Sequence, residues 1–155
     1  MQVRLAQIQD AEAITTLINS AFRKAESFFI DGDRTDVASV RTLMEKGQFL
    51  IAEDKGALAG SVYVEPRGER AYLGLLSVDP TLQRAGIGSA LMNAAENHCL
   101  RVGAQFMDLR IVNLREENHA FYRRRGYVEI STQPFPSDLT PKLPCHFVNM
   151  SKPLR

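Results

Sequence analysis

The feature that most restricts the fold of this chain is a strand that turns through glycines into a helix. It lies in the stretch LSVDPTLQRAGIGSAL, residues 76–91. An apolar run ends at Asp79-Pro80, Gly86 and Gly88 follow one residue apart, and a helical pattern then begins. Glycines let a ligand approach the backbone, and the first turn of a helix offers unpaired N–H groups with the positive end of its dipole behind them. The stretch therefore predicts an anion site that suits a diphosphate.

Two familiar phosphate motifs do not fit this glycine turn. The dinucleotide fingerprint needs Gly or Ala three residues after the second glycine, and that position is Leu91. A P-loop needs Gly-Lys-Ser/Thr, but Gly88 is followed directly by Ser89. From spacing alone, a turn that serves only tight helix–sheet packing remains an alternative.

Hydrophobic periodicity around the turn predicts a mixed α+β sheet with helices on both faces, in one domain over residues 1–155. The strand 106–112 follows the strand 71–78 through a helical crossover, so these two strands should run parallel. The other neighbouring strands should be mostly antiparallel. The predicted strands are 3–7, 49–52, 59–64, 71–78, 106–112, 127–130 and 146–150; the predicted helices are 10–22, 35–47, 87–103 and 118–125.

The same periodicity makes more local predictions. Asp10 should cap the first helix, and the loop 26–36 should expose Phe28 and Phe29. Along the strand 71–78, strict alternation places Tyr72 and Gly74 on one face of the sheet. Leu73 and Leu75 should then lie on the opposite face. The helix after the glycines should bury one face, made of Ile87, Leu91, Ala94, Ala95, His98 and Val102.

Composition excludes several classes of protein. The 155 residues carry a net charge of +1, which is no electrostatic footprint for nucleic acid. No run approaches the ~20 apolar residues of a membrane span, and the N-terminus lacks the apolar core of a signal peptide. Two cysteines form no disulfide framework, and the histidines have no metal-ligand spacing. We therefore expect a cytoplasmic protein without a metal, a nucleic-acid partner or a membrane partner.

A second motif, LREENHAFYRRRGY at residues 114–127, follows the strand 106–112. Asn118 and Tyr122 are four residues apart, so they share one face of a short helix. An amide and a phenol would then face the same cleft as the glycine turn. Taken alone, the motif also allows Asn118 to cap the helix and Tyr122 merely to pack.

Together the two motifs resemble the GNAT N-acetyltransferase superfamily. Gln83, Gly86 and Gly88 match its acetyl-coenzyme A motif, Gln/Arg-x-x-Gly-x-Gly/Ala. NHAFYRRRGY is similar to the next motif of the family, an Asn followed by a Tyr four residues later, a Gly and an aromatic. The resemblance is close over residues 70–130, and elsewhere it is limited to the order of the elements. It implies an acetyl-CoA-dependent enzyme whose splayed parallel strand pair holds the cofactor.

The resemblance also implies roles for individual residues. Val78 would polarise the thioester carbonyl through its N–H and Tyr122 would protonate the departing thiolate, so both are expected to be catalytic. The residues expected to contact the cofactor are Leu76, Ser77, Val78, Gln83, Arg84, Ala85, Gly86, Ile87, Gly88, Ser89, Asn118 and Tyr122. The family often has an acidic base in the strand that ends at Val78, and this chain has none. Deprotonation therefore stays open among Glu26, Glu65, Glu69 and a water chain.

The resemblance also implies that the acceptor site lies between the loops 26–36 and 131–145. Glu26, Phe29 and Tyr72 are the expected substrate contacts, and Glu26, Asp31 and Asp33 would favour a cationic amine. The sequence thus predicts transfer of an acetyl group to a primary amine of a small molecule, by a monomer or homodimer. The alternatives are a protein N-terminal acetyltransferase and a non-catalytic acyl-coenzyme A binding or sensing domain.

Overall fold

The computed structural model describes residues 1–82 and 86–155. Its strands are β1 (Gln2–Leu5), β2 (Gln48–Asp54), β3 (Ala57–Arg67), β4 (Arg70–Val78), β5 (Phe106–Val112), β6 (Val128–Pro134) and β7 (His146–Pro153). Its α-helices are α1 (Ala11–Glu26), α2 (Val37–Lys46), α3 (Ile87–Arg101) and α4 (Glu116–Arg124), with two short 3₁₀ helices, η1 (Ile8–Asp10) and η2 (Pro80–Leu82).

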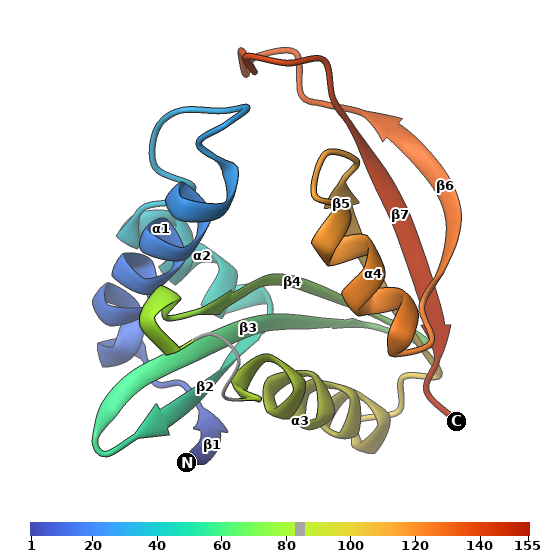
Figure 1. Cartoon of the computed structure of the whole chain (residues 1–155). Coiled ribbons are helices and arrows are strands. Elements are labelled where there is room, and N and C mark those ends of the chain that lie inside the picture. Colours follow the sequence, from blue (N-terminus) through green and yellow to red (C-terminus); the bar gives the residue numbers. More distant parts are fainter. Residues whose placement is uncertain (83–85) are drawn as a thin grey trace.

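All the strands listed belong to one sheet, in the order β1-β2-β3-β4-β5-β7-β6 (Figure 1). β4 and β5 run parallel, and every other neighbouring pair listed is antiparallel. This confirms the predicted mixed, mostly antiparallel α+β sheet. The order of the elements is also as expected, with boundaries that differ by a few residues.

β4 departs from regular alternation at Leu75. This residue adopts a left-handed backbone conformation with φ 55°, and the register between β3 and β4 shifts beside it. Because of this bulge, Leu75 packs with Tyr72 on the α1–α2 side of the sheet, while Leu73 is buried on the other side. The prediction that Leu75 and Leu73 share a face was therefore wrong.

β4 and β5 are paired over a short stretch only. Arg70, Ala71 and Tyr72 pair with Phe106, Met107 and Asp108, and no pairing between the strands follows toward their C-terminal ends. The Arg70 guanidinium donates to both Asp108 carboxylate oxygens, at 2.7 and 2.6 Å, across the paired end. The two strands are thus joined at one end and unpaired at the other, which is the predicted splayed pair.

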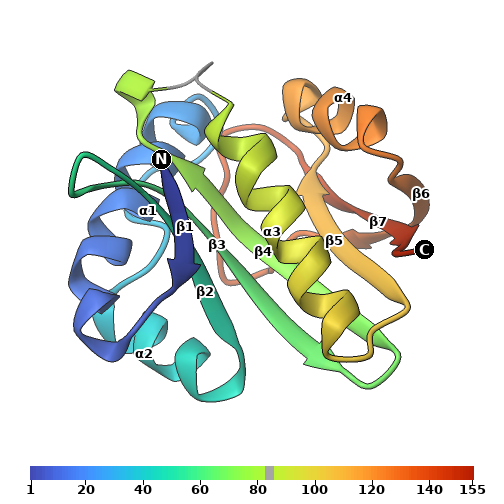
Figure 2. The same ribbon diagram turned by 90° about the horizontal axis from the view of Figure 1, so that it is seen from below.

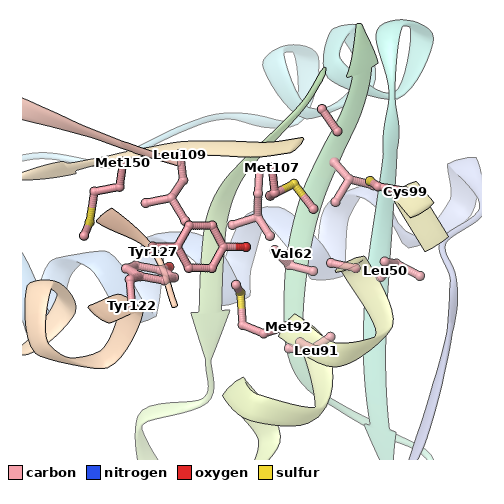
Figure 3. Close-up of a cluster of buried hydrophobic side chains, with 14 of the residues drawn as sticks. Leu50, Val62, Leu91, Met92, Cys99, Met107, Leu109, Tyr122, Tyr127 and Met150 are labelled. Atoms are coloured by element: carbon pink, nitrogen blue, oxygen red, sulfur yellow. The ribbon is translucent and has the colours of Figure 1, made fainter. Parts of the chain in front are cut away.

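Each face of the sheet carries its own core. On one face α3 lies over the central strands (Figure 2), and Leu91 and Met92 pack against the side chains of β3 and β5 together with Tyr122 and Tyr127 (Figure 3). Gly60 allows this close approach, because a Cβ there would lie 2.8 Å from the Leu91 side chain. The other face packs against α1 and α2.

Several local predictions need correction. α3 buries Ile87, Leu91, Met92, Ala95 and Cys99. Its buried face is therefore rotated away from His98, which is half-buried, and Val102, which is exposed. Asp10 does not cap α1 with its side chain; its carboxylate instead accepts the Gln7 N–H in the preceding turn.

Phe28 is exposed as expected, but Phe29 is completely buried. The expectation that Phe29 is exposed was wrong. Its ring packs edge-to-face against Phe28, with centroids 4.9 Å apart, and the segment before β7 lies against this turn, where the Lys142 N–H donates to the Phe29 carbonyl. Within residues 1–82 and 86–155, no helix combines the length and apolar character needed to cross a membrane.

Candidate functional site

A cleft of about 980 Å³ opens where β4 and β5 separate. The second half of β4, the first turn of α3, α4 and the segment after α1 all contribute to its walls. Residues from both sequence motifs therefore line one cavity. The cofactor residues predicted within the described chain all lie on its wall: Leu76, Ser77, Val78, Gly86, Ile87, Gly88, Ser89, Asn118 and Tyr122.

The β4 wall offers main-chain hydrogen-bonding groups. The Asp79 N–H donates to the Ala59 carbonyl on β3, at 2.8 Å. Successive N–H groups along an extended strand point to opposite edges, so the Val78 N–H points away from β3 and toward the gap. The Ser77 hydroxyl donates to the Leu75 carbonyl at 3.0 Å, so it is satisfied within the strand. A ligand lying in the gap would meet backbone groups of β4.

The first turn of α3 forms the second wall. Gly86 precedes the helix with φ 78°, a conformation that favours glycine, and its carbonyl accepts the Ala90 N–H at 3.0 Å. The N–H groups of residues 87–89 have no acceptor in the preceding turn of the helix, which suits them to bind an anion. A Cβ on Gly88 would lie 3.8 Å from Phe121 and 3.9 Å from Val78, so the glycine keeps the cleft open. Gln83, Arg84 and Ala85 lie outside the described residues.

The Ile87 side chain points elsewhere. It is buried in the core beneath α3, where its Cγ2 lies against Gly60. Only the main chain of Ile87 is therefore available to a ligand in the cleft.

α4 supplies the third wall with Asn118, Phe121 and Tyr122. Tyr122 is 6% exposed, and its ring packs edge-to-face against Phe121 and Tyr127, with centroids 5.2 and 5.8 Å away. Burial raises the pKa of the Tyr122 phenol well above its ordinary value, so the group keeps its proton at neutral pH.

An ion pair connects the end of α1 to the start of α4. The Arg115 guanidinium donates to the Glu26 carboxylate at 2.9 Å, and each side chain is only 12% exposed. Arg115 also donates to Glu117 at 2.6 Å and to Asn118 at 3.3 Å. Burial raises the pKa of Glu26, while the positive charge of Arg115 opposes that shift. The pair holds Glu26 at the cleft wall and fixes Asn118 beside the first turn of α4.

The predicted acceptor residues have different fates. Glu26 and Tyr72 line the cleft, and Tyr72 folds its ring over Gly74, where a Cβ would lie 2.9 Å from the ring. Phe29 is buried and is not among the lining residues, so it forms no wall of the site. Asp31 is paired with Lys142 at 3.0 Å, and Asp33 is paired with Arg23.

A second cavity, of about 1140 Å³, adjoins the cleft. It lies between α2 and the strands β3 to β7, and residues from β4 and β5 line both cavities. Of the acids considered as a base, Glu65 lines this second cavity and Glu26 lines the cleft. Glu65 already accepts bonds from the Tyr63 hydroxyl and from Arg67, both at 2.7 Å.

Sequence reasoning missed two residues of the site, Arg115 and Phe121. Phe121 lies inside the second motif, next to Tyr122, and could have been included on that ground. Arg115 carries no local signal, because its partner Glu26 is 89 positions away in the chain. In the part of the chain that the structure describes, no three His, Cys, Asp or Glu side chains gather as a metal site would require.

The cleft fits a long ligand with an anionic part. Its walls are, in turn, the unpaired backbone of β4, the N-terminus of α3 beside Gly88, and the buried phenol of Tyr122. These groups suit the amide-containing arm, the diphosphate and the thioester end of an acyl-coenzyme A. Fold and site together define an acyl-coenzyme A-dependent transferase.

Comparison with known proteins gives the family. Residues 11–127 match the model of the acetyltransferase (GNAT) family. The chain therefore belongs to the GNAT acetyltransferase family, a class of enzymes that use acetyl-CoA, so the predicted family and its cofactor are confirmed.

Two curated relatives are similar in sequence. An S-alkylcysteine N-acetyltransferase of Bacillus subtilis is 26% identical over 137 residues, which are 80% of this chain and 76% of the relative. A mycothiol acetyltransferase of Propionibacterium freudenreichii is 33% identical over 91 residues, which are 54% of this chain. The match spans only 28% of the length of that second relative.

Solved structures resemble the whole chain. The ribosomal-protein-S18-alanine N-acetyltransferase of Escherichia coli has a TM-score of 0.81 at 17% identity, over 99% of this chain and 93% of its own. An aminoglycoside 6'-N-acetyltransferase complexed with coenzyme A has a TM-score of 0.78 at 16% identity, over 100% and 98%. At these identities the similarity shows the fold alone.

Proposed function

We propose that this chain, as a single catalytic domain over residues 1–155, transfers the acetyl group of acetyl-CoA to a primary amine of a small molecule. The observation that carries the proposal is that Val78 and Tyr122 line one cleft from opposite sides of the β4–β5 gap. One group donates a main-chain hydrogen bond and the other holds a proton. Acetyl transfer from a thioester to an amine is accelerated by both.

Acetyl-CoA supplies the activated acetyl thioester when it is bound. The Val78 N–H points into the gap, where it can donate to negative charge that develops on a carbonyl oxygen. The first turn of α3 and Gly88 suit the diphosphate. Asn118 accepts a hydrogen bond from Arg115 and would contact the arm of the cofactor. Tyr122 keeps a proton on its phenolic oxygen, ready for the departing thiolate.

The deprotonation of the incoming amine is assigned to Glu26. Of the three acids considered as a base, Glu26 lines the cleft, whereas Glu65 lines only the second cavity and Glu69 lines neither. Burial raises the pKa of Glu26, which makes its carboxylate a better proton acceptor than an exposed glutamate.

The names of the relatives support an amine acceptor of more than one kind. The Bacillus subtilis relative is named for a small amino acid derivative, and the Escherichia coli structure is named for a ribosomal protein. A protein N-terminus is therefore the second candidate acceptor. We favour the small molecule because the sequence match to the first of these covers 80% of this chain at 26% identity, against 17% identity for the second.

Release of coenzyme A thiol from acetyl-CoA, measured across a panel of small amines, amino acids and peptides, tests the proposal. Turnover with small amines supports it. Turnover with peptides alone would assign the chain to protein acetylation. Coenzyme A binding without any turnover would leave a binding or sensing domain.

A further inference from the structure

Two arginines lie where the cleft meets the second cavity. Arg34 follows α1 and Arg110 belongs to β5, and both line both cavities. Leu109 and Ile111, the neighbours of Arg110, are buried on the α3 side of the sheet. Because side chains alternate along a strand, Arg110 points to the α1–α2 side, toward the second cavity.

The carboxylates that line the two cavities are already engaged within the described chain. Glu26 and Glu117 pair with Arg115, Asp31 with Lys142, Asp33 with Arg23, Glu65 with Arg67 and Asp108 with Arg70, while Asp36 accepts the Ser39 N–H at the start of α2. The expectation that Glu26, Asp31 and Asp33 attract a cationic acceptor stays a prediction, and each of these acids would have to do so while paired with an internal cation.

Arg34 and Arg110 have no carboxylate partner among residues 1–82 and 86–155. Arg34 and Arg110 are therefore two guanidinium groups at this junction that no described carboxylate pairs with directly, and the positive charge of Arg34 also acts on Glu26. A ligand at this junction gains most from an anionic group.

Aromatic rings support both guanidinium groups. Arg110 lies over the Phe147 ring at 4.4 Å from its centroid, and Arg34 lies over Phe22 at 5.6 Å. A guanidinium supported by an aromatic ring still has N–H groups to donate in its own plane, and that fork matches the two oxygens of a carboxylate. The geometry suits a carboxylate better than a single-point anion.

We infer that Arg34 and Arg110 bind a carboxylate of the acceptor, which makes the acceptor an amino acid-type molecule with its amine near the cleft. The inference rests on the proposed function and names the class of its substrate. It also separates the small molecule from a protein N-terminus, whose α-carboxyl group is tied up in a peptide bond.

Matched acceptors test this inference with the full chain. Initial rates are measured with methionine, methioninamide and 3-(methylthio)propylamine, and with the corresponding series built on phenylalanine. The amide has a less basic amine than the acid and the decarboxylated compound has a more basic one, so amine basicity cannot explain a preference for the acid over both. We expect kcat/KM to be at least about tenfold higher for the acid, since hydrogen bonds to a charged group are strong.

Three variants locate the preference. The acid-to-amide ratio of kcat/KM should fall several-fold in Arg34→Gln and in Arg110→Gln, and approach one in the double variant. Arg41→Gln removes an exposed arginine of α2 that lines neither cavity, and it should keep the parent ratio. Coenzyme A affinity, measured by calorimetry, reports whether each variant keeps a folded cleft. A parent enzyme that accepts the amide as readily as the acid, or a double variant that keeps the ratio, would overturn the inference.

Failure of the proposed function gives a different pattern. If no amine is acetylated although coenzyme A binds, N-acetylmethionine is titrated into the coenzyme A-saturated chain. Binding that is lost in the double variant and kept in Arg41→Gln would still support a carboxylate site at Arg34 and Arg110. Absence of binding would overturn it.

Discussion

Removing one hydroxyl, in Tyr122→Phe, tests the chemistry proposed for the cleft. The ring keeps its edge-to-face contacts with Phe121 and Tyr127, and only the hydroxyl is removed. The free energy of unfolding should therefore change by less than about 1 kcal/mol. General-acid assistance is typically worth about 10²–10⁴-fold, and a coenzyme A thiolate is a tolerable leaving group, so we expect kcat to fall at least about tenfold.

Steady-state kinetics with acetyl-CoA and calorimetry with coenzyme A measure the effect. Because the hydroxyl acts as the thiolate departs, kcat should fall while the affinity for coenzyme A stays close to the parent value. Burial raises the pKa of Tyr122, and the acid must keep its proton to act, so the parent kcat should not decline as pH rises through about 10, the ordinary value of a phenol.

The chain provides a matched control in Tyr127→Phe. The Tyr127 hydroxyl donates to the Glu96 carboxylate at 2.8 Å, beneath the same aromatic cluster. Its loss should lower the free energy of unfolding by about 1–3 kcal/mol and leave kcat near the parent value. The assignment of Tyr122 as the acid is refuted if Tyr122→Phe turns over at the parent rate, since water would then supply the proton.

Three further changes probe the cofactor wall, the joined strands and the base. Gly88→Val should weaken coenzyme A binding at least about tenfold in calorimetry and should melt near the parent temperature. As a control, Gly60→Val, whose Cβ would lie 2.8 Å from Leu91, should lower the free energy of unfolding by about 1–3 kcal/mol. A large loss of stability in Gly88→Val would contradict this. The Arg70 guanidinium lowers the pKa of Asp108, so its stabilisation is present above the unfolded value near 4 and is lost as pH falls. Urea titrations should thus show Asp108→Asn about 0.5–1 kcal/mol less stable at pH 7 and converging with the parent below about pH 4, and a constant difference would disprove the linkage. Glu26→Gln should lower kcat/KM and remove the acidic limb of its pH profile. Because burial raises the pKa of Glu26, that limb should lie above the ordinary glutamate pKa of about 4.3 in the parent enzyme. An unaltered pH profile would eliminate Glu26 as the base.

The sequence predicted those parts of the site whose residues lie close together in the chain at a characteristic spacing. Gly86 and Gly88 follow an apolar strand directly, and Asn118 and Tyr122 are one helical turn apart, so spacing alone placed each pair. The bulge at Leu75 has no such signal, because a leucine with φ 55° is chosen by the packing of β4 against α1 and not by its own preference.

Charge was predicted less well than shape. Asp31 and Asp33 look like an acidic surface in the sequence, but Lys142 and Arg23 neutralise them in the fold. In the sequence, Arg110 looks like an ordinary solvent-facing residue of a strand. Its lack of a carboxylate partner among the described residues becomes visible only when side chains distant in sequence are brought together.

The short pairing of β4 with β5 separates the hydrogen-bonded sheet into two parts. β1 to β4 form one half and β5, β7 and β6 the other, and three residue pairs connect them. Val78 belongs to the first half, while α4, which carries Tyr122, follows β5 in the second. The spacing of these two groups therefore depends on the core beneath α3 and on the Glu26–Arg115 ion pair, which join the two halves, as well as on the strand pairing. A ligand that pairs with the open strand edges would add hydrogen bonds where the two strands have none, and would lie between the groups that act on it.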